Sequence, residues 1–142
     1  MLNLLDRLRQ EKAWLLANDG GRRKVFPLYE RDLIIGRSDR MQLHLDALIV
    51  AKKRHKITIA NLGTTQLIGP DHALLHWDAE TQRYILRSFF PNETYVNGEI
   101  TAEASLRDDD QFTLGKVIGT VERERSQFLG ESLYFQIQYC KS

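Results

Sequence analysis

The sequence predicts an all-β fold of antiparallel strands, and two observations point to this class. Short stretches of alternating apolar side chains recur along the chain, for example at residues 73–77 and 83–89. Turn-forming residues separate these stretches, above all the Asn97-Gly98 pair. Asn-Gly between apolar residues is the strongest short-range signal for a β-hairpin. We therefore expect a sheet protein whose connecting loops carry the functional residues.

The bulk composition predicts one soluble domain. The chain has 142 residues, 42% hydrophobic and 27% charged, with a net charge of +1. This balance gives no overall field that would attract nucleic acid or a membrane. A single cysteine, Cys140, excludes an internal disulfide and is compatible with a reducing compartment. Neither a signal peptide nor a membrane span is recognisable, so we expect a cytoplasmic protein without membrane insertion.

The first third of the chain predicts an N-terminal extension and three strands. In residues 1–13, four leucines have helix-like spacing, which is compatible with a short amphipathic helix that packs on the domain edge or docks on a partner. A first strand is expected at residues 14–17. Pro27 interrupts the second strand and predicts an edge position, because proline cannot donate to a β-ladder. A buried strand at residues 33–35 ends at Gly36-Arg37.

Residues 47–68 read as a basic insertion that follows a strand at residues 42–46 and contains its own strand at residues 57–59. It contains the cluster Lys52, Lys53, Arg54, His55 and Lys56. Three interpretations remain open for this cluster: a solvated hairpin tip, a cationic rim beside the functional loops, or a nucleic-acid patch. No aromatic residues interleave with the charges, which disfavours nucleic acid.

The last third predicts a turn at residues 107–110 and a final strand. Three consecutive carboxylates, Asp108 to Asp110, lack the alternate spacing and distal glutamate of a calcium loop, so we assign them to the turn and expect no metal. Phe135, Ile137 and Tyr139 alternate, as expected for one face of a strand. We expect no cofactor.

Several short motifs, in order, resemble a known family. Gly36-Arg37 is followed by His72-Ala73, then by residues 92–98, Asn-Glu-Thr-Tyr-Val-Asn-Gly, and by residues 106–115. This set resembles the forkhead-associated (FHA) domain over residues 14–139. The resemblance implies an FHA/SMAD-like antiparallel β-sandwich of about ten or eleven strands in residues 14–142. It also implies a non-catalytic module that binds phosphothreonine peptides through loops at one end.

The resemblance also implies roles for individual residues. Arg37 matches the phosphate-binding arginine of the family, and Asn92 the asparagine that contacts the peptide main chain. The candidate phosphopeptide-binding residues are Arg37, Ser38, Gly69, Asn92 and Thr94. The candidate loop-bracing residues are Gly36, His72, Asn97 and Gly98, and the auxiliary basic residues are Lys52, Lys53, Arg54 and Lys56.

The chain departs from the family pattern at the phosphate site. Gly69 stands where the family has a phosphate-binding serine, and Pro70, which has no backbone N–H, follows it. Glu93 replaces a glycine and adds a carboxylate near the expected phosphate. These departures favour a module that binds a protein partner, or a second copy of itself, through another surface and without strict phosphate dependence. A phosphothreonine-peptide reader and a nucleic-acid contact through the basic cluster are the alternatives.

Catalysis is not expected. His72 and His76 are four residues apart, which would suit a zinc pair on a helix. This stretch alternates as a strand, where residues four apart are separated by about 13 Å. The chain also has no nucleophile elbow and no phosphate-cradling glycine loop. We therefore expect an interaction module, not an enzyme.

Overall fold

The structure is a computed structural model that describes residues 11–19, 22–37, 49–60, 69–89, 92–114 and 134–140. These residues form twelve strands in two six-stranded sheets. The first sheet has the spatial order β2 (Arg22–Leu28), β1 (Ala13–Asp19), β12 (Tyr134–Tyr139), β11 (Gln111–Leu114), β8 (Thr94–Val96) and β9 (Glu99–Ile100). The second has the order β10 (Glu103–Ser105), β7 (Arg83–Ser88), β6 (Ala73–Asp78), β3 (Asp32–Arg37), β5 (Lys56–Ala60) and β4 (Ile49–Lys53).

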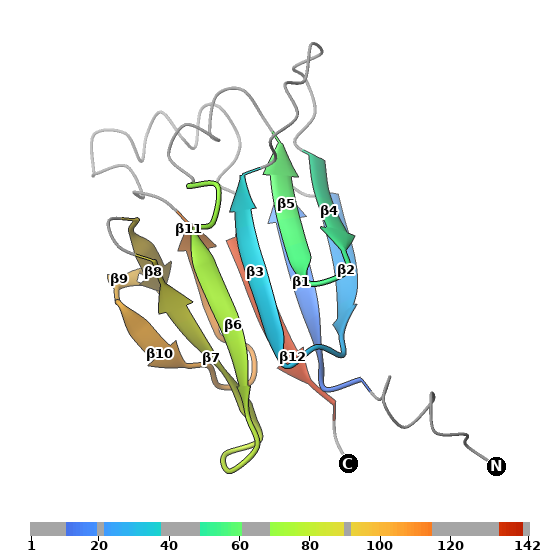
Figure 1. The fold of residues 1–142 in the computed structure, drawn as a ribbon, viewed down its shortest axis with the longest axis vertical. Coiled ribbons are helices and arrows are strands. Elements are labelled where there is room, and N and C mark those ends of the chain that lie inside the picture. The colour runs from blue at the N-terminus through green and yellow to red at the C-terminus, as the bar shows by residue number, and fades with distance from the viewer. Residues whose placement is uncertain are drawn as a thin grey trace, which may run out of the picture.

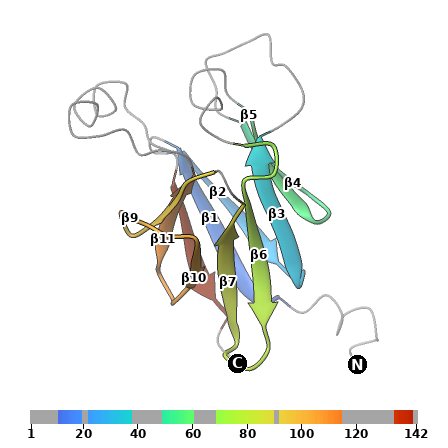
Figure 2. The same cartoon turned by 60° about the vertical axis from the view of Figure 1, so that its left-hand side comes forward.

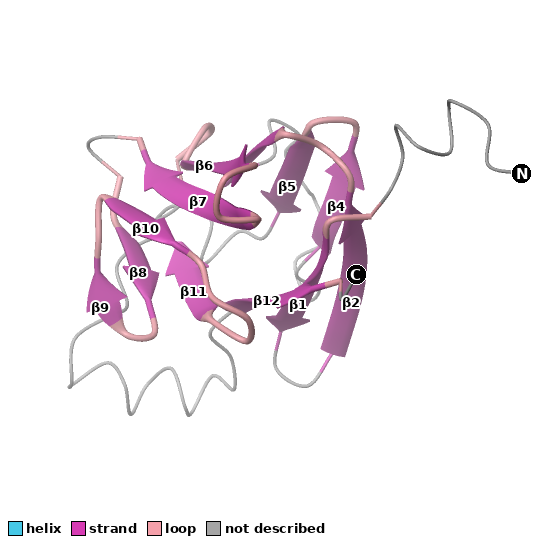
Figure 3. Ribbon diagram, turned by 90° about the horizontal axis from the view of Figure 1, so that it is seen from below, coloured by secondary structure: helices cyan, strands magenta, loops and turns pink. Residues whose placement is uncertain are grey.

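The two sheets pack face to face as a β-sandwich, seen as two layers in Figure 3. The predicted fold class is thus confirmed, with two differences in detail. One pair of strands, β3 and β5, is parallel, although an antiparallel sheet was expected. The strand number exceeds ten or eleven because β9 and β10 have only two and three residues, too few to produce an alternating pattern.

Some predicted elements lie outside the described residues. The N-terminal helix falls mostly in residues 1–10 and the strand at residues 42–46 falls in a second gap. No helix occurs in the described part of the chain. A membrane-crossing helix, long and apolar enough for that purpose, is therefore not found among these residues.

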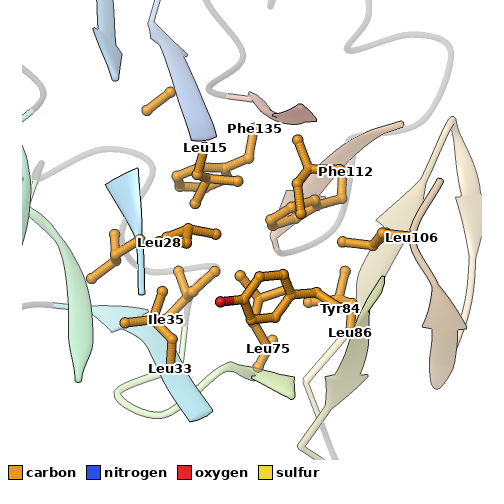
Figure 4. Packing of buried hydrophobic residues seen from close by; sticks show 14 of the residues in the cluster. Leu15, Leu28, Leu33, Ile35, Leu75, Tyr84, Leu86, Leu106, Phe112 and Phe135 are labelled. Atoms are coloured by element: carbon orange, nitrogen blue, oxygen red, sulfur yellow. The ribbon is translucent and has the colours of Figure 1, made fainter. Parts of the chain in front are cut away.

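The core lies between the sheets and is built by the alternation that the sequence shows. Figure 4 shows Leu15, Phe112 and Phe135 of the first sheet facing Leu75 and other side chains of the second sheet. The rings of Phe112 and Phe135 stack with their centroids 5.2 Å apart. Because each strand turns every second side chain inward, the intervening residues form the outer faces of the sandwich.

Two local predictions are confirmed. Strand β2, which contains Pro27, lies at the edge of the first sheet. Asn97 and Gly98 both have positive φ angles, 51° and 86°, as a two-residue hairpin turn requires, and they join β8 to β9. Short-range turn chemistry was therefore sufficient to predict both features.

The region expected as a basic insertion contributes two strands to the second sheet. Strand β5 pairs with β3, and β4 pairs with β5. The side chains of Val50, Ile57 and Ile59 are buried in the core. Residues 49–60 are therefore part of the sandwich, and the turn between β4 and β5 projects from it (Figure 2).

Tyr139 provides a test of how the two sheets are held together. Its hydroxyl accepts a hydrogen bond from the Tyr84 N–H at 2.8 Å and donates to the Leu106 carbonyl at 2.7 Å. Burial raises the pKa of Tyr139 to about 12, so the hydroxyl stays protonated at neutral pH. We expect Tyr139→Phe to lower the free energy of unfolding by about 1–3 kcal/mol, because both partners lose a hydrogen bond.

Chemical denaturation measures this effect, and Tyr95→Phe is the matched control. The Tyr95 hydroxyl bonds only to the Glu93 carboxylate in the described residues, on the outer face of the first sheet. An equal loss of stability in the two variants would contradict the assignment of Tyr139 as a link between the sheets.

Candidate functional site

Three segments that are far apart in the sequence meet where β3 ends at Arg37 (Figure 1). The Arg37 N–H donates to the Gly69 carbonyl at 2.9 Å. The Asn92 side chain donates through Nδ2 to the Asp71 carbonyl at 3.2 Å. Arg37, Gly69 and Asn92, which the sequence singled out separately, are therefore brought together, and the loop of residues 69–72 is the common element.

Gly36 allows this loop to approach β3 closely. A Cβ atom at this position would lie 1.9 Å from the Pro70 carbonyl oxygen, far inside van der Waals contact. Gly36 is also buried. The strand can therefore continue to Arg37 beneath the loop only because residue 36 has no side chain.

His72 connects the loop to the segment after β7. The side chain is fully buried, its Nδ1 accepts from the Gly69 N–H at 3.0 Å, and its Nε2 lies 2.5 Å from the Glu93 carbonyl oxygen. A carbonyl only accepts and a backbone N–H only donates, so the hydrogen is on Nε2 and the ring is neutral. Burial lowers the pKa of His72 below its usual 6.5, opposed in part by the bond to Glu93.

Gly69 and Asn92 fit each other closely. A Cβ atom at residue 69 would lie 2.6 Å from Oδ1 and 2.7 Å from Nδ2 of Asn92. The carboxamide of Asn92 therefore fills the space that a side chain at residue 69 would need. The backbone of Gly69 is also engaged, since its N–H donates to His72 and its carbonyl accepts from Arg37.

Ser88 organises the other side of the site, a role that sequence reasoning missed. Its hydroxyl donates to the Asn92 carbonyl at 2.9 Å and accepts from Thr94 Oγ1 at 2.9 Å. A lone serine at a strand end carries no sequence signal of such pairing. Thr94, a candidate ligand contact, is only 1% exposed and its hydroxyl is used internally. In this structure Thr94 braces the loop and does not present its hydroxyl to a ligand.

Glu93 also differs from the sequence-based expectation. Its carboxylate accepts a hydrogen bond from the Tyr95 hydroxyl at 3.0 Å, and its backbone carbonyl is held by His72. The sequence places this carboxylate next to Asn92, but the structure turns it toward Tyr95.

Arg37 provides the positive charge at the site. Its side chain is half-buried, and no ion pair or side-chain hydrogen bond of Arg37 occurs among the residues that the structure describes. The neighbouring candidate Ser38 lies outside those residues. The nearby Asp71 carboxylate is paired with Lys56 at 3.1 Å.

The auxiliary basic residues are mostly placed away from these loops. In the parallel β3–β5 pair, Lys56 lies opposite Ile34 whereas Arg37 lies opposite Ile59. The β4–β5 turn, which carries Arg54, is thus near the beginning of β3, the other end from Arg37. Lys53, like Arg54, is exposed, and Lys52 forms an ion pair with Glu30 at 2.5 Å. Only Lys56 reaches the 69–72 loop.

Asn97 connects the turn that it forms with Gly98 to the start of β11. Asn97 Nδ2 donates to the Asp110 carboxylate at 3.0 Å, and Asn97 Oδ1 accepts from the Gln111 N–H at 3.0 Å. This turn is at the opposite end of β8 from Thr94, about 10 Å along the strand. It holds the start of β11, not the loops around Arg37.

The three consecutive aspartates also serve a turn. Asp108 accepts from the Tyr139 N–H at 2.8 Å, and Asp110 accepts from the Arg107 N–H at 2.7 Å. Asp109 has a φ of 68° and accepts from a glutamine side chain at 3.3 Å. Within the described ranges, no group of three or more histidine, cysteine, aspartate or glutamate side chains could hold a metal ion.

These features define a β-sandwich in which a glycine-dependent loop, an arginine and an asparagine meet at one end. The family model of the FHA domain matches residues 33–115, more than half of the chain. The chain therefore belongs to the FHA-domain family, as the motif order predicted. FHA domains are protein-interaction modules that bind phosphopeptides. A comparison with curated protein sequences found no match.

Solved FHA domains have the same fold. The FHA domain of an Arabidopsis thaliana hypothetical protein is 14% identical, with a TM-score of 0.58, and the match covers 95% of this chain and 91% of that one. The N-terminal FHA domain of S. cerevisiae Rad53p, in complex with a phosphothreonine peptide, is 13% identical, with a TM-score of 0.55 and coverage of 89% and 94%. The FhaA FHA domain, complexed with the intracellular domain of Rv3910, is 21% identical, with a TM-score of 0.52 and coverage of 89% and 99%. At these identities the likeness is one of fold.

Proposed function

We propose that this chain binds a segment of a partner protein through the loops around Arg37, and that the binding does not strictly require phosphate. The observation that carries the proposal is the close fit between Gly69 and Asn92. Residue 69 offers no hydroxyl, and the Asn92 carboxamide occupies the space that a side chain there would need. A phosphate therefore lacks a ligand that other members of the family supply.

The backbone at residues 69 and 70 does not compensate for this loss. The Gly69 N–H is already bonded to His72, and Pro70 has no N–H to donate. A hydrogen bond to a charged group contributes on the order of 1.5–3 kcal/mol. Losing one such bond reduces the gain in affinity that a phosphate group provides by roughly tenfold to hundredfold.

Phosphothreonine recognition is the second candidate, and Arg37 favours it. A half-buried guanidinium with no ion pair among the described residues is a suitable donor for a dianionic phosphate. The Rad53p domain, which has the same fold, was solved with a phosphothreonine peptide. The FhaA domain was solved with a protein domain as its partner. The nucleic-acid alternative is weaker, because Lys52 and Lys56 are both engaged in ion pairs.

A paired peptide library distinguishes the two candidates. Each threonine peptide is presented to the purified chain both with and without phosphate, and bound sequences are then measured singly. The proposal predicts dissociation constants that differ by less than about tenfold between the two forms. A preference of about a hundredfold or more for phosphate would overturn the proposal and establish the phosphothreonine reader.

Arg37→Ala tests the site itself. We expect it to weaken peptide binding by about tenfold or more, because charged contacts at the centre of an interface contribute disproportionately. Isothermal titration with the best library peptide measures the effect. Arg31→Ala is the matched control, an exposed arginine just before the other end of β3. Unchanged binding by the Arg37 variant would exclude the loops around Arg37 as the binding site.

A further inference from the structure

The outer face of the β1–β2 pair is apolar, which is unusual for the outside of a sandwich. Trp14 is 36% exposed and Val25 is 50% exposed, and they are two of the three large hydrophobic side chains exposed in the described residues. Both point outward because their neighbours in sequence are directed into the core, as Leu15 is fully buried. Burying such side chains against a partner is favourable.

The strand register makes these side chains one continuous surface. Trp14 lies opposite Pro27, and Leu16 lies opposite Val25. We call these four residues, together with Arg23 on the same face, the β1–β2 patch. Polar side chains of β12 border the patch on one side, with Gln138 opposite Trp14 and Gln136 opposite Leu16. On the other side the patch ends at the free edge of the first sheet.

The two ends of the patch have complementary chemistry. Trp14 is at one end, and at the other end Arg23 lies opposite Asn18, about 13 Å along the strand from Trp14. Arg23 is exposed and points to the same face, because it alternates with Lys24, whose Nζ reaches inward to the Val50 carbonyl at 2.8 Å. Tryptophan is the aromatic side chain that best accepts a cation over its face.

We propose that the β1–β2 patch binds a second copy of this chain. A twofold axis that lies in the interface and runs across the strands at the Leu16–Val25 pair would place Leu16 on Leu16 and Val25 on Val25 of the other copy. The same rotation brings Arg23 of each copy to the Trp14–Pro27 end of its partner. An isologous interface requires a surface that is complementary to itself, and a patch with an aromatic end, an apolar centre and a cationic end meets this requirement.

Face-to-face packing is favoured over addition of strands at the edge. Strand β2 is the free edge, but Pro27 removes one donor and Arg23 and Lys24 place charge along it. Proline and charged side chains on an edge strand oppose pairing with another chain. Two sheet faces can pack about 10 Å apart without using that edge.

The size of the patch sets the expected affinity. Strands β1 and β2 are each seven residues long, and β12, which borders the patch, has six residues. Together they define an area of about 15 Å by 23 Å, smaller than the roughly 800 Å² per partner of a standard stable interface. The dimer should therefore be weak, with a dissociation constant on the order of 10–100 μM. It is independent of the loops around Arg37, so its failure would leave the proposed peptide binding untouched.

Sedimentation equilibrium of the full chain from about 5 to 500 μM tests the dimer. Val25→Asp should weaken self-association by at least about tenfold, because it puts a charge in the apolar centre. Ile100→Asp is the matched control, an apolar side chain 61% exposed on the other edge of the same sheet. A chain that stays monomeric at the highest concentration would overturn the proposal. An equal loss of self-association in the Val25→Asp and Ile100→Asp variants would overturn it as well.

A charge exchange tests the orientation of the two copies. R23E alone and W14K alone should each dimerise at least about tenfold more weakly than the unaltered chain, since each loses both cation–π contacts. Mixed in equal amounts, they should form a heterodimer that has one intact Arg–Trp contact and one Lys–Glu pair. Recovery of association only in the mixture supports the twofold arrangement. No recovery, with both variants folded by circular dichroism, would exclude it.

Discussion

Gly36→Ala is expected to lower the free energy of unfolding by about 3 kcal/mol or more, the upper end of the range for overpacked cores. The added methyl would lie 1.9 Å from the Pro70 carbonyl oxygen and 2.6 Å from its carbon, both of which are backbone atoms that cannot rotate away. Either β3 or the 69–72 loop must shift. For a chain of this size we expect the melting temperature to fall by roughly 10 °C.

Gly69→Ala is the informative comparison for this prediction. Its methyl would also be too close to a neighbour, 2.6 Å from Asn92 Oδ1, but there the obstacle is the end of a side chain. Asn92 can turn aside at the cost of its bond to the Asp71 carbonyl. We therefore expect a loss of only about 1 kcal/mol. If Gly69→Ala were as destabilising as Gly36→Ala, the loop would not be held by the backbone contact that we describe.

The Gly36 variant should also lose peptide binding. The loop displaced by the methyl carries Gly69 and Asp71, which bond to Arg37 and Asn92 respectively. Titration at a temperature where the variant remains folded separates this effect from unfolding. Normal affinity in the folded variant would mean that the position of the loop does not matter for binding.

His72→Ala is expected to be equally disruptive. It removes the acceptor for the Gly69 N–H and the donor for the Glu93 carbonyl, and each unpaired backbone group costs about 1–3 kcal/mol when buried. The expected loss is about 3–5 kcal/mol in total, measured by urea denaturation. His76→Ala is the control, because His76 is exposed and bonds only to the exposed Asp32 in the described residues.

The protonation of His72 adds a pH dependence with a definite sign. Its pKa is lowered in the folded state, so below pH 6.5 the unfolded chain binds more protons than the folded chain at this position. Stability from neutral His72 is complete above pH 6.5 and is lost as the pH falls below 6.5 toward the lowered folded pKa. In this pH window, the free energy of unfolding of the His72→Gln variant should change less steeply with pH than that of the unaltered chain. An unchanged pH slope would show that His72 does not titrate with unfolding.

The main outlines of the fold follow from local sequence features. Alternation identified the strands that bury Ile35, Leu75 and Phe135, because a strand directs every second side chain to the same face. Pro27 marked an edge strand, and Asn97-Gly98 a hairpin turn, since these residues restrict the backbone on their own. The order of motifs was enough to indicate the family.

The details of the site could not be read in the same way. Alternation shows which side chains share a face, but not which distant strand or loop lies against them. The parallel pairing of β5 with β3 puts the basic turn at the far end from Arg37, which no local pattern could reveal. Thr94 likewise looked like a ligand contact and Glu93 like a carboxylate that would repel a phosphate, but their side chains bond to Ser88 and Tyr95.

Local sequence patterns were thus sufficient to predict an all-β fold, its edge and turn positions, and several of the residues that meet around Arg37. The chemical groups that those residues present to a ligand follow from the folded arrangement of distant segments. In the sequence, Gly69 shows only that the serine hydroxyl of the family pattern is absent. In the structure, the missing side chain leaves the space that the Asn92 carboxamide occupies. The physical reason is that hydrogen bonds and close packing between distant segments depend on their placement in space, and the folded backbone supplies that placement.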